Sequence, residues 1–571
     1  MRILVSARWG WGNTMKKMGL VGLALAVPAG LVAIDSGRAA DAPVKSVGAV
    51  NCKAPDAPYK NYSCLDEYLG DGFFERMVNY YRLEWGHPSA PADPKAPPSR
   101  RAGWPGQPQT TPPMPFTEWP YGAATSIGVS RPASVDSPLM VALSNTELGK
   151  EMSDAHVQAY GWVNPGGNLS TSSMTPGGNW PAAYAYSPNT ATLDQAVMYI
   201  ERVPDTVQTD HVDWGFRFSG LYGENYRYTT TYGIASYQLL GHNLTNGFDM
   251  PMIWGELYIP TIGEGVLIRL GRYISIPDIE AQLAPNNYMY SHSLTYGYDN
   301  YTNHGLMATW ALTKNWFVQT GVSIGTDTAP WHWGERVNNP LPNPTFPADT
   351  MLKDPGAVPS FAGGIRYQSD SGYDTIYATV DGLNGGTWGY NNLQWMGGTY
   401  YHKFNEQWHI SIESYTLSQR HVLNELDPAN AAVFAANGWP YNPTSGLAFN
   451  SPNAAQCGNT YAPNCTARMY TGLFYLNYSP QPLDNISWRG EFYNDMNGQR
   501  TSTKTRYVST GLGWQHWLSP QVEFRPEIVY YHSLDANAFN GNFNAAPNGA
   551  LVFLPTRNYE YVASADMIWH F

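Results

Sequence analysis

Apolar and polar side chains alternate along many short stretches of this chain, and the alternation runs to its last residue, Phe571. Every second side chain is mostly apolar in DHVDWGFRFSG (210–220), NISWRGEFYND (485–495), QVEFRPEIVYY (521–531) and the final YEYVASADMIWHF. A period of two predicts β-strands with one apolar and one polar face. Because an exposed aromatic strand on a soluble protein would invite aggregation, we expect the apolar faces to contact lipid. Pro526 cannot donate to a strand ladder, so a bulge is expected there.

The composition favours one large membrane barrel over several soluble domains. Charged residues make up 14% of the 571 residues, and aromatic residues make up 14%, with 40 Tyr and 21 Trp. Soluble domains usually carry about 25% charged residues. Beyond residue 40 the sequence has no run of about 18 apolar residues that would predict a spanning helix. The predicted fold is therefore an all-β, antiparallel transmembrane barrel.

The alternating stretches predict about sixteen strands, an even number as in bacterial outer-membrane barrels. Short turns such as 313–315, 405–407 and 519–521 separate long segments such as 274–302 and 419–468, which we expect to be extracellular loops. The stretch 224–242 either adds a strand or folds into the pore. The expected strand starts are residues 154, 194, 211, 250, 265, 304, 316, 360, 374, 391, 408, 469, 484, 506, 522 and 559.

Two segments precede the barrel, which we expect to occupy residues 134–571. Basic residues, an apolar run and small residues near Ala39 predict a signal peptide over residues 1–39, with a membrane anchor as the alternative. Its removal would change 33 basic and 45 acidic residues to 28 and 44, a net charge of −16. Residues 40–133 predict a helix over 65–85 and a proline-rich extended stretch. This segment either plugs the lumen or forms a periplasmic arm.

Four cysteines fall into two close pairs, Cys52 with Cys64 and Cys457 with Cys465. In an exported protein this spacing predicts two local disulfides. A zinc site is the alternative, although neither pair has the usual two-residue spacing and no nearby histidines complete four ligands.

Polar residues on the inward faces of the strands form the candidate site, because a water-filled lumen requires polar walls. An acid–base or metal role for Glu201, His211 and Asp213 is the alternative to a wall position. We expect Arg489 and Glu491 to form a charge ladder with the charged residues of 523–527. The sequence predicts no catalytic residue, cofactor or bound metal. The expected pore-lining residues are Glu201, His211, Asp213, Arg217, Glu413, Arg489, Glu491, Glu523, Arg525 and Glu527.

Aromatic residues lie next to the predicted short turns. Trp316, Trp408, Trp517 and Trp569 are expected to form a girdle at the periplasmic membrane surface. Phe571 ends an aromatic strand and resembles the signal by which the outer-membrane assembly machinery recognises its substrates.

Several stretches together resemble the OmpL-like beta-barrel porins, a group of bacterial outer-membrane proteins. The resemblance implies a pore-forming barrel and gives no substrate or binding residues. The stretches that carry it are CLDEYLGDGFFERMVNYYRLEWG, APPSRRAGWPGQPQTTPPMPFTEWPYG, ERVPDTVQTDHVDWGFRFSGLYG, GELYIPTIGEGVLIRLGRYIS, NYMYSHSLTYGYDNYTNHGLMATWALTKNW and LSPQVEFRPEIVYY.

The predicted function is a passive diffusion porin of the bacterial outer membrane rather than an enzyme. Its partners would be membrane lipid and small solutes or ions, and a homotrimer is the usual assembly for sixteen strands. The acidic mature chain favours weak cation preference and makes nucleic acid a poor partner. The alternatives are a barrel enzyme or adhesin at the outer surface and a secreted soluble carbohydrate-binding or hydrolysing protein.

Overall fold

The computed structural model divides into two compact units, Met1–Val50 and Asn51–Phe571, and all described residues belong to the second. The predicted signal peptide, Cys52, Cys64 and most of the proline-rich stretch lie outside the described residues. The structure describes residues 66–82, 127, 137–175, 177–231, 234–236, 238, 242, 244–274, 278–300, 302–332, 358–386, 393–431, 454–519, 521–545 and 551–571.

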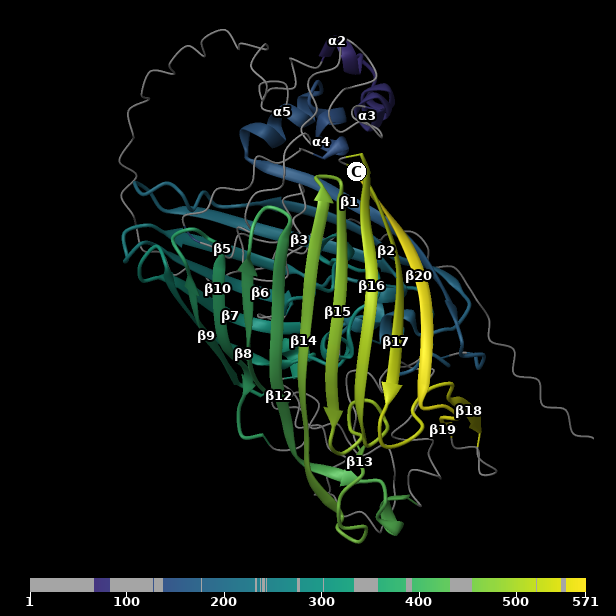
Figure 1. Ribbon diagram of the computed structural model, residues 1–571. Coiled ribbons are helices and arrows are strands. Elements are labelled where there is room, and N and C mark those ends of the chain that lie inside the picture. The colour runs from purple at the N-terminus through teal and green to yellow at the C-terminus, as the bar shows by residue number, and fades with distance from the viewer. Residues whose placement is uncertain are drawn as a thin grey trace, which may run out of the picture. The chain divides into compact units, whose positions relative to one another are not determined.

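Sixteen long strands form a closed antiparallel barrel (Figure 1). The sheet has eighteen strands, of which β4 (Gly247–Asp249) and β13 (Ala454–Ala455) are short additions to longer neighbours. The spanning strands are β1 (Val157–Ser170), β2 (Ala191–Arg202), β3 (Asp213–Gly223), β5 (Ile253–Ile259), β6 (Val266–Ile274), β7 (Thr302–Ala311), β8 (Trp316–Thr326), β9 (Ser360–Gln368), β10 (Asp374–Leu383), β11 (Gln394–Lys403), β12 (Trp408–Asn424), β14 (Asn464–Gln481), β15 (Asp484–Asp495), β16 (Thr505–Ser519), β17 (Val522–Ser533) and β20 (Tyr559–His570).

The last strand closes the barrel against the first. β20 pairs with both β17 and β1, with Trp162 opposite His570. Gly161 and Phe571 exchange two backbone hydrogen bonds, with N···O distances of 3.0 and 2.9 Å. Closure removes the sheet edge that an exposed aromatic strand would otherwise present. The predicted sixteen-stranded antiparallel barrel is confirmed.

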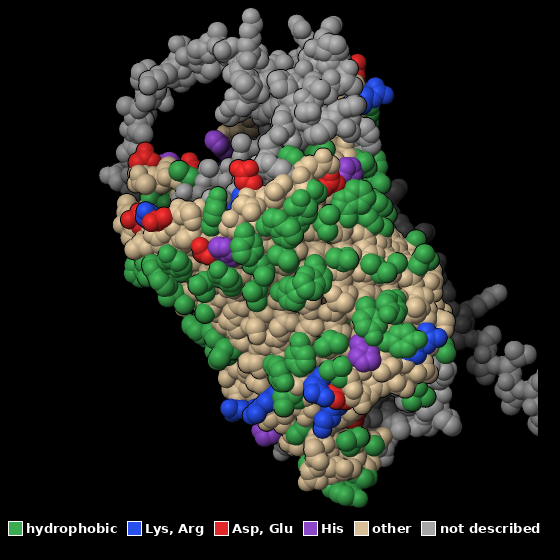
Figure 2. All heavy atoms as spheres, viewed as in Figure 1, with side chains coloured by type: hydrophobic (Ala, Val, Ile, Leu, Met, Phe, Trp, Pro, Cys, Tyr) green, Lys and Arg blue, Asp and Glu red, His purple; other side chains and the backbone are tan. Residues whose placement is uncertain are grey.

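The strand faces differ in polarity as the alternation predicts. Outward side chains such as Trp214, Leu270 and Met396 are between 54% and 63% exposed, whereas inward Arg217 and Arg489 are at most 2% exposed. Figure 2 shows hydrophobic side chains spread over the strand surface of the visible face. An apolar exterior and polar interior are the pattern of a barrel in lipid.

Three of the four predicted girdle tryptophans are exposed, and the fourth is not. Trp316, Trp408 and Trp569 are 38–44% exposed, but Trp517 is 6% exposed and its ring stacks 5.9 Å from that of His570. The alternation of β16 turns odd-numbered residues inward, so Trp517 points into the barrel. Its place in the girdle was wrong, and Trp514, 42% exposed, faces outward on the same strand.

Short helices precede and connect the strands. The helix expected over 65–85 forms two pieces, α2 and α3, separated at Gly70, whose φ of +83° favours glycine. Two unexpected helices, α4 and α5, come before β1. In the described residues no helix is long and apolar enough to cross a membrane. The helical segments are α2 (Asp66–Leu69), α3 (Phe73–Arg82), α4 (Pro138–Leu143), α5 (Glu147–Asp154), α7 (Leu294–Gly297), and the 3-10 turns η2 (Ala183–Ala185), η3 (Glu224–Tyr228), η4 (Ala284–Asn286) and η5 (Pro330–His332).

The helices before β1 are held to one another and to the closing strand. Buried Arg76 of α3 donates from Nε to the Val141 carbonyl of α4 at 3.2 Å and from Nη2 to Ser144 Oγ at 2.9 Å. The Tyr81 hydroxyl donates to the His570 carbonyl. The helices are therefore joined to the seam at which β20 meets β1.

The longer connections carry the remaining small elements. β18 (Asn542–Ala545) pairs with β19 (Leu551–Leu554) between β17 and β20. The predicted Cys457–Cys465 disulfide is present, and it joins the connection between β12 and β14 to the start of β14.

Candidate functional site

The connection between β6 and β7 packs against the inner wall of the barrel. In its described part, residues 278–300, every residue except Ala281 and Asn286 is buried. We call residues 278–300 the inserted segment. Its hydrogen bonds go mainly to inward-facing side chains of β12, β14, β15 and β17. A polar segment with little regular structure can be buried in this way because the wall supplies partners for its backbone.

Three wall carboxylates accept hydrogen bonds from backbone N–H groups of the inserted segment. Glu413 on β12 accepts from Ile279 at 2.9 Å. Glu491 on β15 accepts from the backbone of Leu294 and Thr295, at 3.1 and 2.5 Å. Glu527 on β17 accepts from Ser291, at 3.1 and 3.2 Å to its two oxygens. These three residues, each predicted to line the pore, are covered by the segment they hold.

Two wall arginines donate to carbonyl oxygens of the same segment. Arg489 reaches Ser291 O at 2.7 Å, and Arg525 reaches Ala284 O and Asn287 O at 2.6 and 3.0 Å. Each guanidinium also pairs with a buried carboxylate: Arg489 with Glu280 at 3.4 Å and Arg525 with Asp566 at 2.5 Å. Charge-assisted bonds of this kind are stronger than neutral ones, so both arginines fix the position of the segment.

Burial shifts the pKa of two side chains in the inserted segment, Glu280 and His292. Burial raises the pKa of Glu280, although the neighbouring Arg489 opposes the shift. Burial lowers the pKa of His292 to about 3, and Arg489 and Arg525 lower it further against a hydrogen bond to the Ala281 carbonyl. The imidazole Nε2 donates that bond at 2.7 Å. His292 is therefore neutral at physiological pH.

The other predicted pore residues lie away from the inserted segment. Glu201 on β2 pairs with Arg217 on β3, with Nη2 and Oε2 2.5 Å apart, and both side chains are 1% exposed. Asp213 pairs with Arg202 at 2.8 Å at the start of β3. Each of these carboxylates therefore binds an arginine, which explains its place in the barrel without an acid–base role.

Two predicted pore residues have separate surroundings. Glu523 accepts from Gln515 at 2.5 Å and lies 3.2 Å from Nε2 of His570. His211 lies in the turn before β3, exposed to solvent, with its Nδ1 2.8 Å from Asp210. The structure thus gathers Glu413, Arg489, Glu491, Arg525 and Glu527 around one segment and leaves the remaining five predicted residues elsewhere.

The charge ladder predicted between β15 and β17 is wrong, because β16 lies between these strands and pairs with both. The charges are bridged by the inserted segment, whose Ser291 binds both Arg489 and Glu527. Sequence reasoning treated 274–302 as an outer loop and missed Glu280. A signal was present, since IPDIEAQLAPNNYMYSHSLTYGYDN is long, rich in Tyr and Asn, and carries acids near both ends.

Two other connections pack against the inserted segment. Tyr184, from the connection after β1, stacks on Tyr228 of η3 at 4.1 Å and on His292 at 3.7 Å between ring centroids. Arg272 of β6 donates to the Thr229 carbonyl at 2.6 Å, so the predicted weak stretch 224–242 folds inward at its start. A cavity of about 160 Å³ lies here, lined by residues that include Tyr184, Tyr186, Glu224, Arg227 and Tyr290.

One group of side chains in the described residues has the spacing of metal ligands. Asp278 and Asp299 of the inserted segment meet Glu413 of β12, with one oxygen of each residue within 4.8 Å of the others.

The chain is similar to several solved barrel structures at low sequence identity. The anion-selective porin from Comamonas acidovorans aligns over 73% of this chain and 99% of its own, with 9% identity and a TM-score of 0.42. The outer membrane channel DcaP of Acinetobacter baumannii aligns over 73% and 97%, with 8% identity and a TM-score of 0.40. OmpT of Vibrio cholerae aligns over 73% and 97%, with 7% identity and a TM-score of 0.39.

A comparison with protein-family models identifies the family of the chain. No curated protein sequence matches the chain significantly. The model of the family described as "Putative beta-barrel porin-2, OmpL-like" matches residues 156–554, which run from the start of the first strand to the connection before the last. This match covers well over half of the chain, in agreement with the closed sixteen-stranded barrel. The chain belongs to the family of OmpL-like beta-barrel porins.

Proposed function

We propose that the protein is a passive diffusion channel of the bacterial outer membrane for small hydrophilic solutes and ions, narrowed by the inserted segment. The observation that carries this proposal is the closed barrel with an apolar outer surface and a polar inner wall. A barrel of sixteen strands is wide enough to leave an aqueous path beside an inserted segment. The hydrogen bonds to Glu413, Glu491 and Glu527 hold that segment along one side of the wall.

The charge distribution supports weak cation preference. The mature chain expected after residue 39 has 28 basic and 44 acidic residues, and so a net charge of −16. Arginines of the inner wall, such as Arg217 and Arg525, are already paired with buried carboxylates. Because paired arginines present little free positive charge to a passing anion, the unbalanced acids set the sign of the field.

The position of Ile127 supports the proline-rich segment as a second element that narrows the lumen. Ile127 is the one described residue of 83–136, and it is 4% exposed. It packs with the inward-facing Tyr258, Leu267 and Phe317. We therefore favour the lumen over a periplasmic arm for the proline-rich segment.

Solute passage through reconstituted vesicles tests the proposed function. We expect liposomes that contain the folded protein to swell in arabinose, more slowly in glucose, and barely in a disaccharide such as sucrose. Liposomes with heat-unfolded protein at the same mass serve as the control. Absence of swelling in every sugar, with folded protein confirmed in the vesicles, would contradict a diffusion channel for small solutes.

A further inference from the structure

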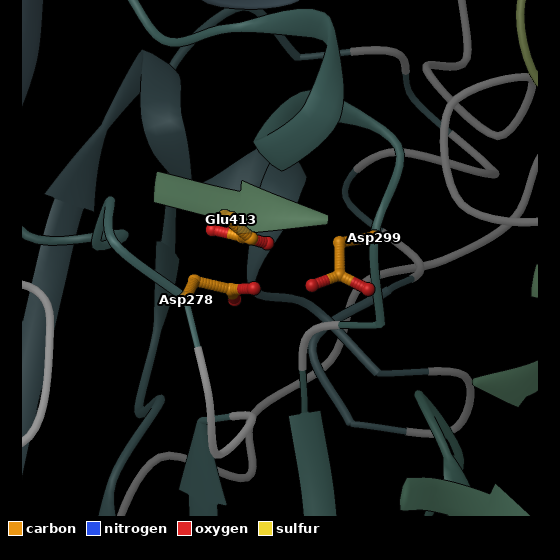
Figure 3. A group of neighbouring side chains, drawn as sticks. All are labelled: Asp278, Asp299 and Glu413. Carbon is orange, nitrogen blue, oxygen red and sulfur yellow. The ribbon is translucent and has the colours of Figure 1, made fainter. Parts of the chain in front are cut away.

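Three carboxylates converge at the inner wall, where the inserted segment begins and ends. Asp278 is the first described residue of the segment, Asp299 lies next to its last, and Glu413 projects from β12. Figure 3 shows the three carboxylate groups turned toward a shared centre. One oxygen of each lies within 4.8 Å of the other two, and the residues are 5%, 1% and 2% exposed.

Two of the three acids, Asp299 and Glu413, lack a basic partner among the described residues. The nearest bonds of Arg500 go to the backbone carbonyls of Tyr298 and Asp299 rather than to a carboxylate. Buried charges in proteins are paired or coordinate metals, so three acids together require a positive partner or shared protons.

Two carboxylate oxygens of the group are available to a ligand. Glu413 Oε2 accepts from the Ile279 N–H, but its Oε1 has no hydrogen-bond partner among the described residues outside the three acids. Asp299 Oδ1 accepts from the Asn300 N–H at 2.6 Å, and its Oδ2 likewise has no partner outside the three acids.

A neutral oxygen lies beside the same group. Thr399 on β11 is directly opposite Glu413, and its Oγ1 also lacks a hydrogen-bond partner among the described residues. Both side chains face inward, with Thr399 4% exposed. Directly opposite residues on paired strands hold their Cβ atoms about 5 Å apart, so Thr399 is the neighbour of Glu413 on the inner wall.

We propose that Asp278, Asp299 and Glu413 bind a divalent cation of the calcium type. Calcium prefers six to eight oxygen ligands, and three carboxylates supply up to six, with Thr399 as a neutral addition. The absence of nitrogen and sulfur donors from the group disfavours zinc and copper. The ion would link the two ends of the inserted segment to β12, and so fasten the segment at its base.

Terbium luminescence tests the proposal directly. Tb³⁺ substitutes for calcium in oxygen sites, and buried Tyr415, two residues after Glu413 on the same face of β12, is in position to sensitise its emission. We expect the folded protein in detergent at pH 7.5 to give saturable emission at one ion per chain, displaced by excess Ca²⁺. Glu413→Gln and Asp299→Asn should weaken Tb³⁺ binding by about tenfold or more, because each removes a charged ligand.

Glu523→Gln is the matched control. Glu523 is also a buried inward carboxylate of the wall, but it binds Gln515 and His570 instead of the inserted segment, and it is not one of the three acids. This variant should keep the affinity of the unchanged protein. Emission that is absent, non-saturable, or equal in all four proteins would overturn the site and indicate carboxyl groups that share protons.

Thermal unfolding of the unchanged protein makes the test independent of whether the variants fold. Addition of Ca²⁺ to protein stripped with a chelator should raise Tm by about 2 °C or more, because a ligand that binds only the folded state stabilises it. An equal Tm with Ca²⁺ and with chelator would also contradict the proposal. Neither measurement depends on channel activity, so failure here leaves the diffusion proposal separately testable.

Discussion

Arg489 shows how a single buried charge positions the inserted segment. Its side chain is fully buried and reaches Glu280, the carbonyl of Ser291 at 2.7 Å and the hydroxyl of Ser291 at 3.0 Å. A buried guanidinium has lost its water, so its stability depends on these partners. Removal of Arg489 would leave the Glu280 carboxylate buried without its cation.

We expect Arg489→Met to destabilise the folded barrel by about 3–5 kcal/mol, the usual cost of breaking a buried ion pair. Arg506→Met is the control, because Arg506 and Asp535 pair at 2.7 Å on an exposed surface. Exposed pairs contribute little to stability because water screens them, so this variant should be nearly neutral. Heat-induced unfolding in detergent, followed by circular dichroism, measures both. Equal effects of the two variants would show that Arg489 is not the anchor described here.

His292 should make the inserted segment sensitive to acid. Burial lowers its pKa to about 3, so between about pH 6.5 and 3 the unfolded chain binds a proton that the folded chain does not. Stability is therefore lost as the pH falls through this window, by at most about 1.4 kcal/mol per pH unit from this group. His292→Gln can keep the bond to the Ala281 carbonyl and should lose less stability between pH 6.5 and 4. Parallel pH profiles of the two proteins would contradict this role.

At single positions, the sequence predicts which face of a strand a residue occupies better than it predicts which residues that side chain contacts. The alternation places Arg217, Arg489 and Glu491 on the inner face, because a period of two fixes the face once the strand is known, and all three are buried. The same alternation places Trp517 inward, against the girdle position that its nearness to a turn predicts. The partners of Arg489 and Glu491 lie on the inserted segment, which has no periodicity from which to predict contacts.

The strands themselves were largely predictable from the sequence. The starts expected at 316, 360, 374, 408, 484, 522 and 559 coincide with those of β8, β9, β10, β12, β15, β17 and β20. β14 begins at Asn464, before the expected 469, and α5 occupies 147–154 where the first strand was expected to begin. The bulge expected at Pro526 is absent. The register with β20 is regular there, and the register with β16 continues unchanged beyond Arg525 and Pro526.

The inserted segment should become mobile when its wall contacts are weakened. Glu491→Gln combined with Glu527→Gln replaces the carboxylates that accept the N–H groups of Leu294, Thr295 and Ser291. Neutral acceptors bind about half as strongly, so we expect noisier currents and a larger mean conductance in planar bilayers.

Glu523→Gln is the control for that double variant. Glu523 is also a buried inward carboxylate of β17, but it binds Gln515 and His570. Its conductance and noise should match those of the unchanged protein. If Glu523→Gln alters the current as strongly as the double variant, wall charge and not the segment controls passage.

On the scale of the whole molecule, the barrel is continuous and its interior is partly filled. The β1–β20 pairing closes the wall, while Ile127 contacts its inner face beside Tyr258. Because Ile127 is part of residues 87–133, we propose that this stretch reaches the conduction path. α3 and α4 flank this stretch and are already in contact through Arg76 and the Val141 carbonyl.

Deletion of residues 87–133 should leave a folded barrel with a wider path. The short remaining connection can join α3 to α4, because those helices already touch. We expect the single-channel conductance to increase by about twofold or more, since conductance follows the open cross-section. Replacement of the same residues by a Gly/Ser linker of equal length is the control. It keeps the length of the segment but removes its side chains, and so shows whether the length or the side chains of the segment limit the conductance. An unchanged conductance after deletion would place this segment outside the lumen.

The most direct measurement is the single-channel conductance of the folded mature protein in a planar bilayer, under a KCl gradient. A polar barrel narrowed by one fixed segment and bearing excess carboxylates should give discrete openings and a reversal potential displaced toward that of K⁺. Absence of current from protein shown to be folded and inserted would mean that the lumen is blocked, and a reversal potential displaced toward that of Cl⁻ would contradict the charge distribution proposed for the path.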